Sequence, residues 1–181
     1  LRLNVCDYVV CGGVSFSPDG AVRKVDGMIW SPDGICRPFA DNANGTVNSD
    51  GCGLVVLTQL DAALRRGDWI YATILGVASN NDGARKAGFS APSHEGQVEV
   101  IQMAMADAGV TGDNIDYVEA HGTGTKLGDP IELHALTEAL QTNREILLGS
   151  VKGNIGHLNT AAGIPGLIKV AEMMWRREMV P

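Results

Sequence analysis

A histidine occurs twice in this sequence just after a predicted strand, each time in a glycine-containing segment. The first segment, EAHGTGTKLGDPIE (119–132), contains His121, and the second, KGNIGH (152–157), contains His157. Open α/β folds place their ligand-binding chemistry in the loops at the carboxyl ends of strands. The repetition therefore predicts an α/β fold in which two adjacent strand-end loops each carry an imidazole.

The local pattern around each histidine supports this arrangement. The first loop follows a predicted strand over 115–119, and its glycines allow tight turns and close approach of a ligand to the backbone. Asp129 and Pro130 then open a predicted helix over 131–140, with a capping side chain before a proline at the first helical position. The second loop follows a predicted strand over 146–151.

The remaining apolar runs alternate between strand and helix patterns. Apolar residues recur at helical spacing between Ser93, a natural N-cap, and Gly109, a natural C-cap, and so predict a helix there. A buried strand is predicted over 7–14, further strands over 54–57 and 69–78, and further helices over 61–66 and 164–175. Loops are predicted over 41–53 and 85–93, and 28–39 is turn-rich, with Pro-Asp-Gly at 32–34 as a strong turn signal. Strands that alternate with helices indicate a layered α/β fold.

Composition excludes several classes of protein. With 181 residues, of which 45% are hydrophobic, the chain can bury a sizeable core as one domain or as part of a larger one. The net charge of −7 argues against nucleic-acid binding, which requires a basic face. No apolar run is long enough to span a membrane. The four cysteines form no C-x-x-C pair and fit reduced thiols in a cytoplasmic protein.

Three other chemistries fit the histidine loops less well. The run from Gly122 to Gly128 resembles a phosphate-binding loop, but its lysine follows a threonine and no Gly-Lys-Ser/Thr occurs. The chain also lacks the acidic residue that a dinucleotide-binding fold places after its next strand. A metal site formed by His121, His134 and His157 stays open as an alternative, although no two of them have i, i+3 or i+4 spacing. We predict no metal.

Two histidines on neighbouring strand-end loops can aim two neutral donors at one carbonyl oxygen. Such donors stabilise the negative charge of a developing enolate or tetrahedral oxyanion, or exchange a proton with it. Lys152 supplies a nearby positive charge that can hold the protonation state of the pair, and Thr123 and Thr125 offer hydroxyls to a polar ligand. The constellation contains no nucleophile.

These residues resemble a known family. EAHGTGTKLGDPIE and GSVKGNIGH (149–157) closely resemble the two histidine motifs of β-ketoacyl synthase domains, most of all those of modular type I polyketide synthases. The resemblance extends along nearly the whole chain, through DYVVCGGV (7–14), SPDGICRPF (31–39) and APSHEGQ (91–97). Each histidine motif is specific by itself, and the two together point to the same family.

The resemblance implies a thiolase-like fold of layered α/β/α/β/α architecture and decarboxylative Claisen condensation. A cysteine accepts the growing acyl chain, and a malonyl-type extender arrives on the phosphopantetheine arm of an acyl carrier protein. On this interpretation His121 and His157 bind the extender thioester carbonyl and promote loss of carbon dioxide. Lys152 supports the pair electrostatically, and Thr123 and Thr125 line the pantetheine tunnel. The resemblance also implies a cytoplasmic homodimer with no directly bound cofactor and no nucleic-acid or membrane partner.

The chain departs from the family pattern at both ends. The family's nucleophile lies in a Thr-Ala-Cys-Ser-Ser type motif upstream of Leu1, a glycine-rich Gly-Gly-Thr-Asn segment is expected after Pro181, and neither motif occurs here. Residues 1–181 are expected to cover less than half of a single ketosynthase domain, from the end of its N-terminal half to the start of its C-terminal half. This part alone is expected to be inactive. A non-elongating ketosynthase-like domain, which holds a carrier-bound acyl chain and passes it on, stays open as the alternative function.

Four further residues are predicted to have structural roles. Cys52 is expected to be a small buried thiol and not the nucleophile, because no helix N-terminus follows it to depress the pKa of its thiol. Cys11 is expected to be inert packing at the end of a buried strand. Glu119 and Asp129 are expected to orient the first histidine loop through hydrogen bonds and not to act as general acids or bases.

Overall fold

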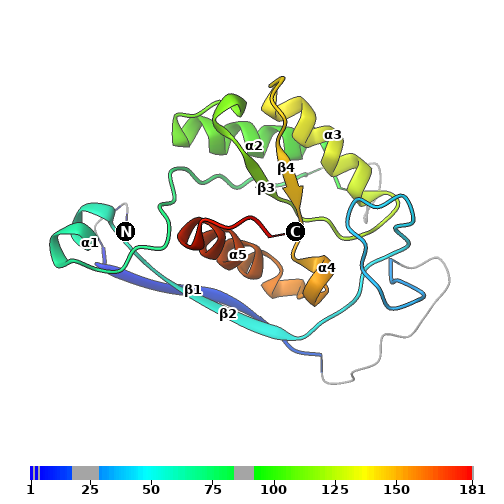
Figure 1. Cartoon of the computed structure of the whole chain (residues 1–181), viewed down its shortest axis with the longest axis horizontal. Helices are drawn as coiled ribbons and strands as arrows, with labels where there is room; N and C mark the ends of the chain where they lie inside the picture. The colour runs from blue at the N-terminus through cyan, green and yellow to red at the C-terminus, as the bar shows by residue number, and fades with distance from the viewer. Residues whose placement is uncertain (2, 4, 18–28, 84–91, 181) are drawn as a thin grey trace.

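The strands that precede the two histidines pair with each other. In the computed structural model, which describes residues 1, 3, 5–17, 29–83 and 92–180, β3 (Tyr117–Glu119) and β4 (Leu147–Gly149) form a parallel pair. The N–H of Ala120 continues the ladder by donating to the Gly149 carbonyl oxygen at 2.8 Å. Because parallel strands end at the same edge of a sheet, both histidine loops leave this edge together (Figure 1).

A separate antiparallel ribbon joins β1 (Tyr8–Ser15) to β2 (Gly51–Thr58), so both predicted strands are confirmed. One face of the ribbon packs on a small apolar core: Val55 with Leu158, Ala161, Ile164 and Ile168. The other face is exposed and carries Tyr8, Val10, Val14, Leu54 and Val56. The expectation that 7–14 is a buried strand is therefore wrong, because only one face has a packing partner among the described residues.

The two cysteines of the ribbon are exposed, and the prediction that both are buried is wrong. Cys52 pairs with Val14 across the ribbon and so lies on its open face, since strand side chains alternate between faces. Cys11 lies in the neighbouring strand and is also open to solvent.

The predicted helices are confirmed, most clearly α2 (His94–Ala108). The Ser93 hydroxyl accepts a hydrogen bond from the Gly96 N–H at 3.0 Å, and Gly109 ends the helix with a left-handed φ of 67°. The other helices are α1 (Leu60–Arg66), α3 (Gly128–Leu140), the single turn α4 (Lys152–Ile155) and α5 (Gly163–Arg176), with 3₁₀ turns η1 (Gly112–Asn114) and η2 (Asn159–Ala161).

Helices flank the β3–β4 pair on both sides. Figure 1 shows α2 and α3 above the pair and α5 below it. Val98 of α2 packs against Ala135 and Ala139 of α3, whose small side chains let the two helices approach closely. This layering of helices around a parallel pair of strands agrees with the predicted α/β class.

The segment 69–78 differs from its prediction as a strand. Within the described part of the chain it has no strand partner, and it runs instead along α2. The Val77 N–H donates to the Asp107 carboxylate at 2.8 Å, and a Cβ on Gly76 would lie 2.5 Å from the Ala104 carbonyl oxygen. An apolar run predicts an extended chain, but strand pairing also needs a neighbouring strand.

Two further boundaries differ from the predictions. Helix α3 begins at Gly128, and the Asp129 side chain, predicted to cap it, bonds the backbone N–H groups of Gly124 and Phe39 instead. The segment after β4 is not a loop throughout, because Lys152–Ile155 forms the turn α4. The predicted turn at 32–34 is confirmed, with Gly34 at a φ of 76°. Most of the predicted loop 85–93 lies outside the described residues.

The cap of α2 can be tested by Ser93→Ala. Ser93 is 2% exposed, so its removal leaves the Gly96 N–H without its acceptor in a buried setting. We expect the free energy of unfolding to fall by about 1 kcal/mol, with a range of about 0.5–2, as measured by chemical denaturation. An unchanged denaturation midpoint would contradict the assigned cap.

Candidate active site

Glu132 holds the backbone of the first histidine loop. One carboxylate oxygen accepts from the N–H of His121 at 2.6 Å, and the other accepts from the N–H of Gly122 at 2.8 Å. Two successive N–H groups bound by one carboxylate fix the direction in which the loop leaves β3. Glu132 lies inside the first histidine motif, but no role was predicted for it. Its place in the first turns of the following helix was the available signal.

Asp129 fastens the same loop to the segment 31–39. Its Oδ1 accepts from the Gly124 N–H at 3.0 Å and its Oδ2 from the Phe39 N–H at 2.7 Å, and the residue is 4% exposed. Phe39 has a φ of 59°, a left-handed conformation that bulky residues rarely adopt. The Phe39 ring lies so close to Gly122 that a Cβ there would be 2.9 Å from Cε2 of Phe39. The predicted scaffold role of Asp129 agrees with these contacts.

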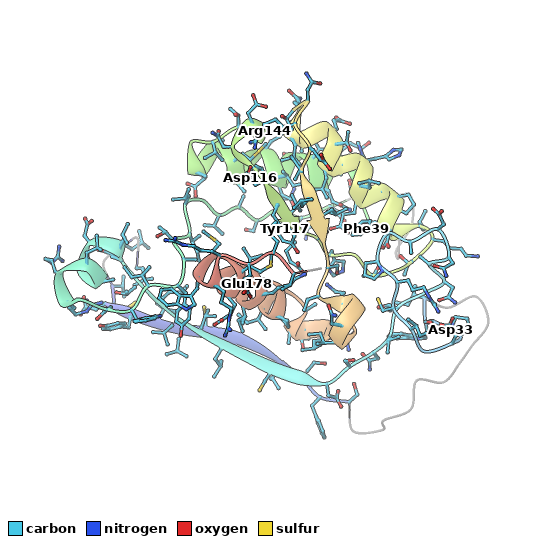
Figure 2. All side chains as sticks on the ribbon, in the orientation of Figure 1. Asp33, Phe39, Asp116, Tyr117, Arg144 and Glu178 are labelled. Atoms are coloured by element: carbon cyan, nitrogen blue, oxygen red, sulfur yellow. The ribbon has the colours of Figure 1, made fainter. Side chains whose placement is uncertain are left out.

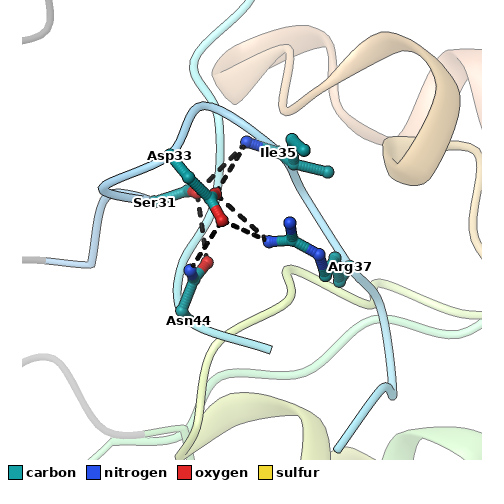
Figure 3. A network of polar contacts seen from close by, with 5 residues as sticks. All are labelled: Ser31, Asp33, Ile35, Arg37 and Asn44. Atoms are coloured by element: carbon teal, nitrogen blue, oxygen red, sulfur yellow. Dashed lines mark hydrogen bonds and ion pairs between the residues drawn. The ribbon is translucent and has the colours of Figure 1, made fainter. Parts of the chain in front are cut away.

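The segment 31–39 is itself braced by Asp33, as Figure 3 shows. The Asp33 carboxylate accepts from the Ser31 hydroxyl at 2.7 Å, pairs with Arg37 at 2.9 Å and accepts from the Asn44 amide at 3.2 Å. The Ser31 hydrogen bond is the main cause of the lowered pKa of Asp33, so the carboxylate stays charged. The loop thereby presents a preformed surface to the first histidine motif.

His157 is held by a segment that was predicted only as a polar loop. The His157 N–H donates to the Val47 carbonyl oxygen at 2.7 Å, and the Ser49 N–H donates to the His157 carbonyl oxygen at 3.0 Å. These bonds form a parallel bridge between Asn48 and His157. No sequence signal links positions so far apart, and only the tertiary structure reveals the contact.

The two imidazole rings converge. The His121 and His157 ring centroids are 5.2 Å apart, with planes at 89°. Ser150, which is 8% exposed, bridges the loops by donating its hydroxyl to the Gly122 carbonyl oxygen at 3.2 Å. At this ring separation two imidazole N–H groups can share one oxygen acceptor. The predicted meeting of the two rings is confirmed.

Lys152 is the first residue of α4, within the second histidine motif, and is only 3% exposed. Desolvation lowers the pKa of its ammonium group, while the negative charges of Glu132 and Glu119 act in the opposite direction. Carboxylates on two sides therefore support the charged form of a buried lysine.

Both rings are neutral near pH 7. Desolvation, the charge of Lys152 and the neighbouring His157 lower the pKa of His121 to about 4, although part of this residue is open to solvent. Desolvation and Lys152 also lower the pKa of His157. Protonation of either ring thus disfavours the folded state, and the stability contributed by His121 is lost as the pH falls from about 6.5 toward about 4.

A hydrogen bond assigns the tautomer of His157. The Asn159 N–H donates to Nδ1 of His157 at 2.9 Å, so Nδ1 carries a lone pair and the ring proton lies on Nε2. His157 therefore presents Nε2–H as a donor. A neutral ring that is fixed in this form can stabilise an oxyanion without first losing a proton.

Thr123 and Thr125 bond each other, with their hydroxyl oxygens 3.1 Å apart. The Thr125 hydroxyl also accepts from the Gly128 N–H at 3.1 Å, at the start of α3. Both residues are half-buried, and their assignment to substrate binding stays a prediction.

The other candidates do not join the histidine pair. Within the described residues, no group of three or more His, Cys, Asp or Glu side chains could hold a metal ion. His134 instead lines a surface cavity with His94 and Glu138. Cys36, for which the sequence indicates no partner, is buried and contacts the Thr123 carbonyl oxygen at 3.4 Å. Burial raises the pKa of its thiol, which makes it a poor nucleophile.

Comparison with protein families identifies the chain. The model of the β-ketoacyl synthase C-terminal domain matches residues 71–181, and that of the N-terminal domain matches residues 1–63. The chain belongs to the β-ketoacyl synthase family. Within the described residues, no helix of this ketosynthase chain has the length and apolarity needed to cross a bilayer.

Curated relatives of the ketosynthase chain are much longer polyketide synthases. The chain is 42% identical over 180 residues to polyketide synthase PksN of Bacillus subtilis, a match that covers 96% of the chain and 3% of the relative. It is 49% identical over 171 residues to a subunit of the phenolphthiocerol/phthiocerol polyketide synthase of Mycobacterium tuberculosis, covering 91% of the chain and 12% of the relative.

Solved ketosynthase structures confirm the predicted thiolase-like fold. The ketosynthase from module 1 of the bacillaene synthase of Bacillus amyloliquefaciens matches with a TM-score of 0.90 and 44% identity, over 97% of this chain and 32% of that one. The ketosynthase from module 6 of the bacillaene synthase of Bacillus subtilis matches with a TM-score of 0.93 and 40% identity, over 100% of this chain and 34% of that one. The chain thus spans about a third of the length of these solved chains.

The electrostatic role of Lys152 can be tested by NMR titration of carbon-13-labelled histidines. We expect His121 to titrate near pH 4, and Lys152→Met to raise the pKa values of both His121 and His157, because a nearby positive charge is lost.

Lys126→Met is the matched control, because Lys126 is an exposed lysine of the same loop and is not a cause of either histidine shift. A His121 pKa at or above 6.5 in the unaltered ketosynthase would show that the ring is not held neutral as described.

Proposed function

We propose that this chain contributes the decarboxylating part of a β-ketoacyl synthase site in polyketide or fatty acid chain elongation. The reaction is the decarboxylative Claisen condensation of a carrier-bound malonyl-type extender with an acyl chain on a cysteine outside this sequence. The convergence of two neutral imidazoles, with ring centroids 5.2 Å apart, is the observation that carries the proposal. The family membership and the relatives named as polyketide synthases support it.

Each step of the reaction gives the two rings a definite role. The extender thioester oxygen accepts hydrogen bonds from Nε2–H of His157 and from the ring N–H of His121. As the bond to the carboxylate carbon breaks, carbon dioxide leaves, and the electron pair forms an enolate whose oxygen is stabilised by both donors. The enolate carbon then attacks the acyl thioester, a carbon–carbon bond forms, and the cysteine leaves as thiolate.

The remaining predicted residues support this chemistry. Together with desolvation, Lys152 keeps the two rings neutral, and it adds a positive charge beside the developing enolate. Thr123 and Thr125 are proposed to contact the pantetheine arm, because their hydroxyls are half-buried on the same loop as His121.

We propose that the chain acts inside a larger assembly. Its partner is an acyl carrier protein whose phosphopantetheine arm brings the extender, and the complete domain is a cytoplasmic homodimer without nucleic-acid or membrane partners. The matches to the N-terminal and C-terminal family models support a chain that joins the end of one half-domain to the start of the other. We expect the chain to be inactive alone, because condensation requires the separate cysteine nucleophile.

Condensation is favoured over simple retention of a carrier-bound chain. A non-elongating domain needs the fold but not two oriented donors, and here both rings are positioned and neutral. The acyl-passing alternative has no observation of its own in its favour.

The proposal is tested by His121→Ala and His157→Ala in a complete ketosynthase domain that contains this chain. We expect each variant to slow carbon dioxide release from a malonyl-carrier substrate by about 10²–10³-fold, because one oxyanion donor is lost. His134→Ala removes an exposed histidine of α3 and serves as the control, with no change expected. Unchanged carbon dioxide release in both site variants would refute the proposed roles.

A further inference from the structure

An ion pair outside the second histidine motif joins α5 to the end of β3. Nζ of Lys169 lies 2.9 Å from Oε2 of Glu119, and the two side chains are only 9% and 8% exposed. Removing one partner of such a pair leaves an uncompensated buried charge. The position of Glu119 therefore depends on a lysine that lies 50 residues further along the chain.

Tyr117 completes this cluster. Its hydroxyl donates to Oε2 of Glu119 at 2.5 Å, and Figure 2 shows it between the β3–β4 pair and α5. Desolvation and this hydrogen bond raise the pKa of Tyr117, so the phenol stays protonated as a donor. Two glycines leave the necessary space: a Cβ on Gly149 would overlap the Tyr117 hydroxyl oxygen, and one on Gly166 would lie 3.0 Å from Cγ of Glu119.

The other carboxylate oxygen of Glu119 reaches the second histidine motif. Oε1 accepts from the Val151 N–H at 2.5 Å. The Val151 carbonyl oxygen accepts in turn from the N–H groups of Asn154 at 2.9 Å and Ile155 at 3.1 Å, which closes the turn α4. Val151 directly precedes Lys152, so Glu119 determines where this turn begins.

We propose that Lys169 is a positioning residue that holds Glu119 against Val151 and thereby sets where α4 presents Lys152 to the two histidines. Lys169 lies on α5 and outside both histidine motifs, so no local sequence signal marks it for this role. The kinetic consequence rests on the function proposed above, whereas the positioning itself can be measured without substrate.

Lys169→Met in a complete ketosynthase domain that contains this chain tests the proposal. The charges that act on the two rings are Lys152 for both and His157 for His121, so displacement of Lys152 raises both histidine pKa values toward 6.5. We expect this rise in an NMR titration, with Lys152→Met as the reference for complete loss. We also expect kcat for decarboxylation to fall about 10- to 100-fold at nearly constant KM, because a displacement of a catalytic group by about 1 Å can slow a reaction by about 100-fold.

Two further variants separate positioning from stability. Lys169→Met combined with Glu119→Gln removes the unpaired charge and keeps an oxygen that can accept from Val151, but it also removes one of the carboxylates that favour the charged form of Lys152. We therefore expect histidine pKa values and kcat between those of Lys169→Met and those of the unaltered protein. Arg176→Met breaks the Arg176–Glu172 pair of 2.8 Å on the same helix, whose side chains are 65% and 39% exposed. An exposed pair contributes little, so we expect neither readout to change.

Unchanged histidine pKa values and kcat in Lys169→Met would overturn the proposal. A fall in kcat that is fully explained by a smaller fraction of folded protein would overturn it as well. If Lys169→Met does not fold, Lys169→Gln replaces it, because glutamine keeps a hydrogen-bond donor but is uncharged and shorter than lysine. The same results would then support or overturn the proposal. If His121→Ala and His157→Ala leave carbon dioxide release unchanged, the proposed function fails, whereas the substrate-free titration still decides the role of Lys169.

Discussion

Hydrogen bonds from backbone N–H groups to three carboxylates hold the two histidine loops, and the rest of the site depends on them. Within the first motif, Glu132 accepts from His121 and Gly122, and Asp129 accepts from Gly124. The bonds from Phe39 to Asp129 and from Val151 to Glu119 join segments that are distant in sequence. Hydrogen bonds to a charged acceptor are about twice as strong as neutral ones. The glycine-rich loops are therefore rigid where they carry the imidazoles.

The same carboxylates allow a cation to remain buried where its charge acts on both rings. Lys152 is 3% exposed, and the charges of Glu132 and Glu119 favour its ammonium form against desolvation. Desolvation and the charge of Lys152 in turn lower the pKa values of His121 and His157, so both rings are neutral donors. Backbone geometry and electrostatics are thus set by one group of charges, and a change in any carboxylate affects both.

The accuracy of the predictions depended on how local each interaction is. Helix α2 was predicted with its caps because Ser93 and Gly109 act within one turn of their own positions. The segment 69–78 was not, because an apolar run becomes a strand only beside another strand, and within the described residues it lies along α2. The prediction that Cys52 is buried was wrong for a similar reason. Cys52 lies on the exposed face of the β1–β2 ribbon, and the local sequence does not specify which face of a ribbon is covered.

The sequence by itself determined the family, the α/β class and the proximity of His121 to His157. Glycine-rich motifs and histidines that follow strands are local patterns, so they can be recognised without a structure. Only the tertiary structure decided what holds those rings in place. The bridge from Asn48 to His157, the bond from Phe39 to Asp129 and the pair formed by Lys169 and Glu119 all join positions that no spacing rule connects. Such contacts form because folding brings buried charges and unpaired N–H groups to the same place, where each must find a partner.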